Sequence, residues 1–218
     1  MRALSHEQAR RVYDRIGRRQ ETQAFYEDRA TDVLIEAGGF ESAGHVFEFG
    51  CGTGRLAERL LAQHLTASAT YRGIDISPKM VSLAGRRVAR FGPRAEVHLS
   101  AGGPLTHERS GGYDRWVSTF VLDLLSSEEI DQVLADAHRM LARGGRLCLA
   151  GLTNGVGPCS RAVARLLALA HRLNPVVVGG CRAVELRSHL QTSAWRVLAH
   201  AKLTPYCIPL EAVVVERC

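Results

Sequence analysis

The chain has 218 residues, of which 46% are hydrophobic, and its formal net charge is +6 at pH 7. This length supports one domain with a full core and is short for two. No apolar run approaches the roughly 18 residues that span a bilayer. We therefore expect a single domain over residues 1–218 without a membrane span.

Basic residues dominate the charge. Lysine occurs only at Lys79 and Lys202, and the arginines are spread over every segment of the chain. This spread is typical of a solvated surface. A basic face for nucleic acid or anionic lipid is the alternative, and nucleic acid is disfavoured because the sequence shows no appended RNA-binding module. The sequence leaves the oligomeric state open.

The six cysteines form neither a C-x-x-C pair nor a zinc-binding pattern, so we predict no bound metal. A chain of this length does not need disulfides, and we expect six reduced thiols in a cytoplasmic protein. The N-terminus lacks the apolar core of a signal peptide. Its interspersed acids Glu7, Asp14 and Glu21 argue against a mitochondrial presequence.

Two helices are predicted before the first strand. Apolar residues at helical spacing indicate an amphipathic helix over residues 5–19 and a second helix over residues 21–37. The pair Gly38-Gly39 ends the second helix.

The first strand is predicted to run directly into a glycine turn and a helix. The run His45–Phe49 is rich in strand-forming residues, and Gly50, Gly52 and Gly54 follow at alternate positions. Glycines allow a sharp reversal and a close approach of ligand to backbone. The free N–H groups at the helix start favour a carboxylate or phosphate. The dinucleotide pattern G-x-G-x-x-G would need a third glycine where the chain has Arg55.

A second strand over residues 69–76 ends in an acid, Asp75. A carboxylate at the end of this strand can accept both hydroxyls of a ribose, whichever nucleoside is bound. The alternative role is a helix N-cap. Ser77-Pro78 begins the next helix, with proline in its first turn.

The second half of the chain continues the alternation of strands and helices. A serine-capped helix begins at Ser126 and is expected to end at Gly144-Gly145. Residues 153–193 are an insertion with predicted helices over residues 161–173 and about 182–190. The remaining predicted strands cover residues 95–100, 113–120, 146–152, 195–203 and 209–215.

Three patterns together resemble class I S-adenosylmethionine (SAM) methyltransferases, in particular small bacterial relatives of ubiquinone and menaquinone C-methyltransferases. They are E-x-G-x-G-x-G from Glu48, Y-D-R-W-V-S-T from Tyr113, and R-M-L-A-R-G-G-R-L-C-L from Arg139. The resemblance implies an α/β fold with a Rossmann-like seven-stranded sheet, mostly parallel with an antiparallel last strand. It also implies helices on both faces, an N-terminal helical cap over residues 1–40, and SAM as cofactor.

The same resemblance assigns cofactor roles to residues at the strand ends. Glu48 is expected to organise the methionine end of SAM, Asp75 to bind the ribose, and Ile76 to lie on the adenine. Ser118 is expected to line the methionine or methyl region. Turn residues expected to pack against the cofactor are Gly50, Cys51, Gly52 and Gly54.

The adenine position departs from the family pattern. The family usually has an acid where this chain has Ala101, so Ser100 or a backbone carbonyl is expected to bind the adenine instead.

Candidate contacts to the methyl acceptor lie outside these motifs. Asp123, just past the fourth strand, is the candidate to accept a proton or attract a cationic amine, and the alternative is a loop acid that supports the helix start. Tyr13 and Tyr26 from the cap, and His171 and Arg182 from the insertion, are candidate substrate contacts or else packing and surface residues. We expect the cap and the insertion to meet above the end of the fourth strand and to enclose a largely apolar pocket, because a reacting site gains from excluded water.

We predict that the protein moves the sulfonium methyl of SAM by in-line displacement to an O, N, C or S nucleophile of a small, partly apolar molecule. A second interpretation has the basic N-terminal helix on an anionic membrane, where the acceptor is a lipid headgroup or a quinone. A third is a SAM-binding interaction protein without catalysis. Neither D-P-P-Y nor N-P-P-Y follows the fourth strand, which argues against methylation of DNA bases.

Overall fold

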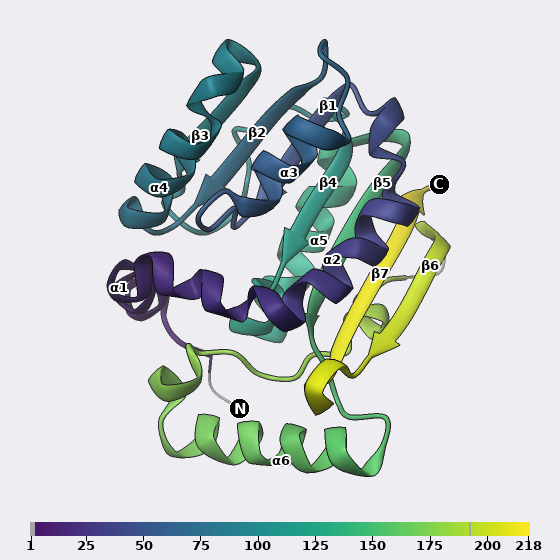
Figure 1. Ribbon diagram of the computed structural model, residues 1–218. Helices are drawn as coiled ribbons and strands as arrows, with labels where there is room; N and C mark the ends of the chain where they lie inside the picture. Colours follow the sequence, from purple (N-terminus) through teal and green to yellow (C-terminus); the bar gives the residue numbers. More distant parts are fainter. Residues whose placement is uncertain (1–2, 192) are drawn as a thin grey trace.

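The structure of the protein, a computed structural model, describes residues 3–191 and 193–218. Residues 1–2 of the expected cap and residue 192 of the expected insertion lie outside this range. Seven strands form one sheet in the order β3-β2-β1-β4-β5-β7-β6 (Figure 1). The strands are β1 (His45–Phe49), β2 (Thr70–Asp75), β3 (Ala95–Leu99), β4 (Tyr113–Thr119), β5 (Leu141–Leu152), β6 (Trp195–Leu203) and β7 (Leu210–Arg217). The α-helices are α1 (His6–Ile16), α2 (Ala24–Gly38), α3 (Arg55–Gln63), α4 (Pro78–Val88), α5 (Ser127–Met140) and α6 (Pro158–Leu173).

Only β7 is antiparallel to its neighbours in the sheet. It pairs antiparallel with β5 and β6, while the pairs among β1 to β5 are parallel. The predicted seven-stranded sheet with an antiparallel last strand is therefore confirmed. No helix of the described residues is long and apolar enough to cross a bilayer.

The core has two halves because successive strand side chains point to opposite faces of the sheet. In β7, Ala212 and Val214 pack with α2 and α3, while Val213 and Val215 pack with α5. Helices thus cover both faces, as Figure 1 shows. Since α2 packs on β5 and β7, the parts of the N-terminal cap that lie over the carboxyl ends of the strands are α1 and the short 3₁₀ segment Gly17–Gln23.

Local signals set most helix starts. Ser126 accepts the backbone N–H of Glu129, whose carboxylate accepts the N–H of Ser126, which is a capping box at the start of α5. Ser77 accepts the N–H of Met80 at the start of α4. The predicted end of α5 at Gly144-Gly145 is wrong, because the chain already joins β5 at Leu141, which pairs with Tyr113.

The second predicted helix of the insertion, over residues 182–190, is also wrong. This stretch is extended and contains only a 3₁₀ turn, Leu186–His189. The N–H of Val184 donates to the carbonyl of Leu152, and the N–H of Leu186 donates to the Glu211 carboxylate at 2.7 Å. These bonds attach the stretch to the end of the sheet, where its apolar residues pack beside α5.

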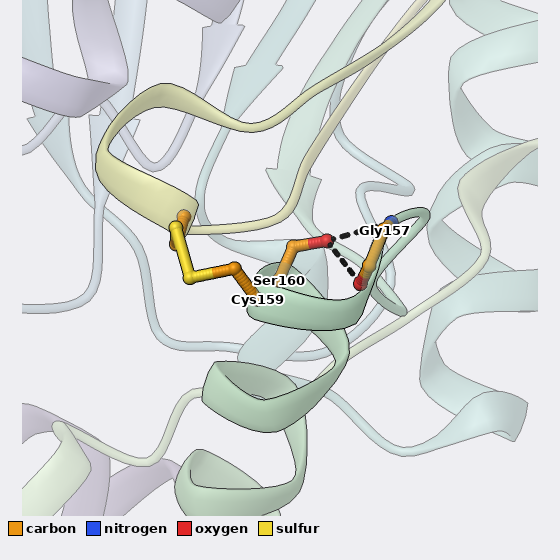
Figure 2. The surroundings of a disulfide bond; sticks show 4 residues. Gly157, Cys159 and Ser160 are labelled. Carbon is orange, nitrogen blue, oxygen red and sulfur yellow. Dashed lines mark hydrogen bonds between the residues drawn. A yellow bond between two sulfur atoms is a disulfide. The ribbon is translucent and has the colours of Figure 1, made fainter.

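The expectation of six reduced thiols is corrected by a disulfide between Cys159 and Cys207 (Figure 2). It joins the first turn of α6 to the 3₁₀ turn Pro205–Cys207 between β6 and β7. The Cα atoms are 5.7 Å apart although 48 residues separate them in sequence. The spacing of the cysteines in the sequence does not predict this disulfide, because only the fold brings the two segments together. Cys51, Cys148, Cys181 and Cys218 are free.

Candidate functional site

Two cavities meet at the carboxyl ends of β1, β2 and β4. The larger has a volume of about 320 Å³ and the smaller about 60 Å³. Gly50, Gly52 and Gln20 line both of them, as do Thr119 and Phe120. Ligands of open α/β sheets bind at this edge of the sheet. Within the part of the chain that the structure describes, no group of His, Cys, Asp and Glu could hold a metal ion.

The glycine turn is held by its neighbouring strand. The N–H groups of Gly50 and Cys51 both donate to the carbonyl of Ile74 in β2, at 2.8 and 2.9 Å. Gly50 has φ of 74°, and a Cβ atom there would lie 2.3 Å from Val121. Cys51 lines the smaller cavity.

Gly54, which the family resemblance places against the cofactor, lines neither cavity. It precedes α3 with φ of 77°, and a Cβ atom there would lie 2.9 Å from the backbone of Ala84. This glycine is required by the close packing of α3 on α4, because any side chain would push the two helices apart.

Asp75 lies between the two loops that it connects. One carboxylate oxygen accepts the N–H of Gly52 at 2.9 Å, and the other accepts the N–H of Ser77 at 2.9 Å. Burial raises the pKa of this carboxyl, and these two backbone bonds counteract the shift. Asp75 and Ile76 line the larger cavity. Each carboxylate oxygen has a second lone pair, so Asp75 can still accept ligand hydroxyls.

Glu48 is almost fully buried beside the smaller cavity. The hydroxyl of Tyr71 donates to one carboxylate oxygen at 2.5 Å. Burial raises the pKa of Glu48 to about 8, against the smaller opposite effect of the Tyr71 bond. Glu48 therefore holds its proton near neutral pH until a cation approaches.

The loop after β3 supplies one wall of the larger cavity through Ser100, Gly102, Gly103 and Pro104. Ala101, at the position where the family usually has an acid, is exposed and does not line the cavity, whereas Ser100, the alternative expected from the sequence, does. The Ser100 hydroxyl accepts the N–H of Gly102 at 3.1 Å, which turns the loop inward at that point.

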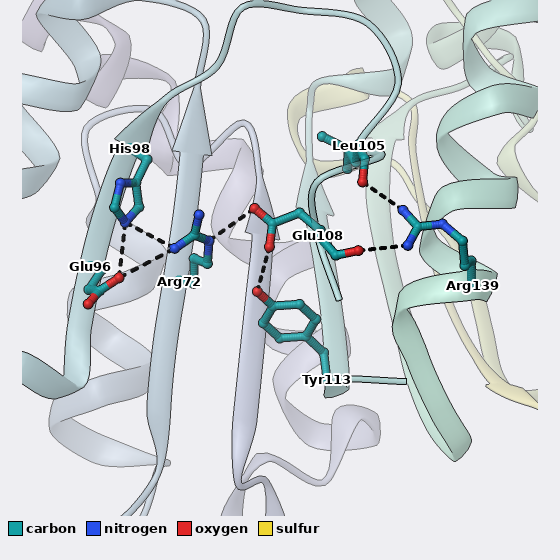
Figure 3. Close-up of polar contacts among 7 residues, drawn as sticks. All are labelled: Arg72, Glu96, His98, Leu105, Glu108, Tyr113 and Arg139. Carbon is teal, nitrogen blue, oxygen red and sulfur yellow. Dashed lines mark hydrogen bonds and ion pairs between the residues drawn. The ribbon is translucent and has the colours of Figure 1, made fainter. Parts of the chain in front are cut away.

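A polar network fixes the far end of this loop (Figure 3). Glu108 accepts from Arg72 of β2 at 3.1 Å and from the Tyr113 hydroxyl at 2.8 Å. Arg139 of α5 donates to the backbone carbonyls of Glu108 and Leu105, at 2.7 and 2.6 Å. The loop that carries the cavity wall is thus tied to strands and helix on both sides.

Ser118 also differs from its expected role. It is buried, and its hydroxyl donates to the carbonyl of Phe49 at 2.9 Å, which ties β4 to β1. The cavity wall begins one residue later, at Thr119 and Phe120. Phe120 has φ of 57°, a costly conformation for a bulky residue and one that clusters at functional sites.

The cap closes the larger cavity from above. Leu4, His6, Ala9 and Tyr13 line it, and burial raises the pKa of the Tyr13 hydroxyl. Tyr26 lines neither cavity and instead packs edge-on against Phe120.

Two polar residues of the cap belong to the site and were missed from sequence. Asp14 accepts the Ser77 hydroxyl at 2.6 Å, directly beside Asp75. Gln20 lies over Gly52, and its buried carbonyl oxygen has no hydrogen-bond partner among the described residues. No motif or spacing marks either residue, since only the docking of the cap brings them to the glycine turn.

The Asp123 carboxyl is fully buried and lines neither cavity. One oxygen accepts the N–H of Leu152 at 3.2 Å, and the other has no partner in the described part of the chain. Burial raises the pKa of Asp123 to about 7. Asp123 is thus covered in this structure and does not face either cavity.

The two insertion residues proposed to contact substrate have other surroundings. Arg182 donates through its guanidinium to the carbonyl of Leu125, and its backbone N–H donates to the carbonyl of Asp123 at 3.0 Å. His171 is buried on the inner side of α6, and neither residue lines the two cavities. The Arg182 side chain attaches the insertion to the turn after β4, whereas His171 is buried within the insertion.

The cap and the insertion do touch above the end of β4. A Cβ atom at Gly180 would lie 2.6 Å from Leu4 and 3.5 Å from Leu124. However, none of the described residues of 153–191 and 193 lines either cavity. The apolar cavity therefore lies between the cap and the sheet edge, and not between the cap and the insertion as the sequence suggested.

Comparison with known proteins shows similarity to methyltransferases. Residues 47–147 match the model of a family described as a methyltransferase domain. An uncharacterized methyltransferase of Bacillus thuringiensis (strain Al Hakam) is 32% identical over 131 residues, which make up 60% of this chain and 55% of the relative. The chain thus spans about half the length of the curated relatives it matches.

Solved structures share the fold over most of the chain. The cyclase SpnF matches with a TM-score of 0.75 and 14% identity, covering 100% of this chain and 98% of its own. The geranyl diphosphate C-methyltransferase of Streptomyces coelicolor A3(2), solved with Mg²⁺, geranyl diphosphate and S-adenosyl-L-homocysteine, matches with a TM-score of 0.66 and 12% identity. That match covers 88% of this chain and 79% of the other. At such identities the likeness concerns the fold.

Proposed function

We propose that the chain is a class I methyltransferase and that it transfers a methyl group from SAM to a small, partly apolar molecule. The observation that carries the proposal is a pair of carboxyl groups on either side of the glycine turn: the buried Glu48 before it, and the partly buried Asp75, which accepts the N–H of Gly52. Glu48 borders the smaller cavity and Asp75 the larger one, and the two cavities meet at Gly50 and Gly52.

The residues present fit the two ends of SAM. Glu48 is a buried acceptor for the ammonium group of the methionine end, because its carboxylate receives only one side-chain hydrogen bond, from Tyr71. Asp75 retains lone pairs for the two ribose hydroxyls. Ile76 and the loop from Ser100 provide the walls for the adenine. When bound, SAM supplies an electrophilic methyl group on a sulfonium, and the protein's contribution is to orient it and exclude water.

The acceptor is inferred from the lining of the larger cavity. Apart from the cofactor contacts, its wall is mostly apolar and is contributed by Phe49, Val121, Leu124, Leu125 and Val133. Such a wall favours an apolar body with one polar reacting group. The geranyl diphosphate methyltransferase described above is an example of this fold acting on a molecule with an apolar chain.

Asp123 is the proposed proton acceptor for this reaction. Its pKa of about 7 suits a general base near neutral pH. Because the carboxyl is fully buried, it can reach an acceptor only when its cover, which includes the stretch around Arg182, moves aside. The backbone bond between Arg182 and Asp123 holds this cover in place.

Calorimetry with SAM, S-adenosyl-L-homocysteine and NAD tests the cofactor assignment. We expect both sulfur compounds to bind and NAD not to bind. Incubation with methyl-labelled SAM and fractionated metabolite extracts then tests transfer. Binding of NAD in preference to SAM would contradict the proposal.

The binding and labelled-SAM experiments also test a second candidate function. The structural match that spans the whole chain is to a protein described as a cyclase, and a fold does not fix the reaction that it hosts. The alternative is therefore a SAM-binding protein that does not transfer methyl groups. Tight SAM binding, with no labelled product from any extract, would favour this alternative.

A further inference from the structure

Helix α6 is held away from the rest of the molecule. In Figure 1 it runs along the outer edge, beyond the carboxyl ends of the strands. Only Ser160 and His171 of its residues are buried. Its main contacts are with the 3₁₀ turns Pro175–Val178 and Pro205–Cys207, the second of which is linked to it by the Cys159–Cys207 disulfide (Figure 2). One long side of α6 therefore faces solvent.

The solvent side of α6 carries two adjoining rows of side chains, which we call the outer face of α6. One row is apolar: Leu166, Leu169 and Leu173 recur at steps of three and four residues and are 66%, 53% and 79% exposed. Leucines of this exposure on a lone helix are a costly surface in water. Val177 in the following turn, 73% exposed, extends the row.

The second row is basic. Arg161, Arg165 and Arg172 recur at steps of four and seven residues, which places them beside the leucine row, and all three are exposed. Residues 153–184 contain no aspartate or glutamate. The outer face of α6 is thus apolar along one side, positive along the other, and free of acidic residues from its own segment.

We propose that the outer face of α6 docks on an anionic lipid surface. A helix that lies in a membrane interface buries an apolar row among the acyl chains and keeps a basic row at the headgroups. A second copy of the chain is a poorer occupant, because a two-fold interface would bring the same positive row against itself. The inference concerns a surface and does not depend on the proposed methyl transfer.

The N-terminal helix, which the sequence suggested for such a contact, lacks the necessary apolar row. In α1, Ala9 and Tyr13 line the larger cavity. Its basic side is partly neutralised, since Glu7 pairs with Arg10 and Arg11. The docking surface therefore shifts from α1 to α6.

Vesicle flotation of the intact, oxidised protein tests the proposal. We expect the protein to float with phosphatidylcholine vesicles that contain about one third phosphatidylglycerol, and not with pure phosphatidylcholine, because each basic residue near an anionic surface adds about fivefold to binding. High salt should release it. The triple variant R161Q/R165Q/R172Q should bind about 100-fold more weakly. The variant L166Q/L169Q/L173Q should lose at least about tenfold.

Matched controls distinguish binding by the outer face of α6 from effects of net charge and from non-specific hydrophobic binding. R86Q/R109Q/R143Q makes the same change in net charge at exposed arginines outside α6, and L99Q/V197Q/L198Q replaces exposed apolar residues of β3 and β6. Both should float as the unmodified protein does. Equal losses in the controls, or no flotation at low salt, would overturn the proposal. So would a concentration-dependent dimer in sedimentation that L166Q/L169Q/L173Q disperses, without any flotation.

Discussion

The glycine-turn edge of the sheet and the cover above it are held by different kinds of contact. At the edge, the turn after β1 and the turn after β2 hold one another through backbone groups: Gly50 and Cys51 donate to Ile74, and Gly52 donates to Asp75. The cover is held by separate links, among them the side-chain bond from Ser77 to Asp14 and the backbone bond from Arg182 to Asp123. We infer that the edge is a rigid cofactor platform, and that the cover can open without disturbing it. Substitutions in the two regions should therefore have separable effects.

The largest effect is expected at Asp75. Replacing Asp75 by alanine should weaken SAM binding by about 2–4 kcal/mol, because two charge-assisted hydrogen bonds to the ribose are lost. Isothermal titration measures this loss. Asp114→Ala is the matched control, since Asp114 also accepts two backbone N–H groups, those of Gly44 and His45, but at the opposite edge of the sheet. Equal losses of affinity in both variants would show that Asp75 acts only through stability.

The next effect is a dependence of SAM affinity on pH. The pKa of Glu48 in the empty site is about 8, so at lower pH the carboxyl must lose a proton before it can bind an ammonium group. Affinity should therefore fall by up to tenfold per pH unit below 8, or about 100-fold at pH 6. Titrations across this range measure the slope. Glu48→Gln should bind weakly and without this slope, and a flat profile in the unmodified protein would remove Glu48 from the ammonium site.

The burial of Asp123 under the cover can be tested by the pH dependence of the free energy of unfolding. Its folded-state pKa of about 7 lies above the value of an unfolded aspartate, so the stability that its protonated form contributes is fully present below about pH 4 and is lost as the pH rises through 7. Asp123→Asn should therefore stabilise the protein at pH 8 by up to about 4 kcal/mol and change little at pH 4. Denaturant unfolding at the two pH values measures this. The same variant should lower methyl transfer without weakening SAM binding, whereas destabilisation at pH 8 would contradict the assigned pKa.

The smallest effect concerns the link between the two regions. Asp14→Ala removes the hydrogen bond to Ser77, which should loosen α1 by about 1 kcal/mol, or about fivefold in amide hydrogen exchange. SAM affinity should change less than exchange does. Asp131→Ala, which breaks a surface pair with His189, should leave the exchange of α1 unaltered. Exchange unchanged in Asp14→Ala would show that the cap is held by its apolar contacts alone.

The sequence by itself determined the elements whose signals are local. The glycines after β1, Asp75 at the end of β2, and the serine caps at Ser77 and Ser126 depend on backbone geometry within a few residues, so their spacing was enough to predict them. The predicted strands, together with the family resemblance, predicted the seven-stranded sheet with helices on both faces. Glu48 could be assigned to the site because its place relative to the turn is fixed by the strand.

Only the tertiary structure decided which of these residues face a ligand. Gly54 faces Ala84 and Ser118 bonds to Phe49, because packing between elements determines where each position points. Gln20 reaches the glycine turn, and Cys159 meets Cys207, through contacts between segments that are far apart in the chain. Such contacts leave no periodic trace in a single sequence, because they depend on how completed elements dock against one another.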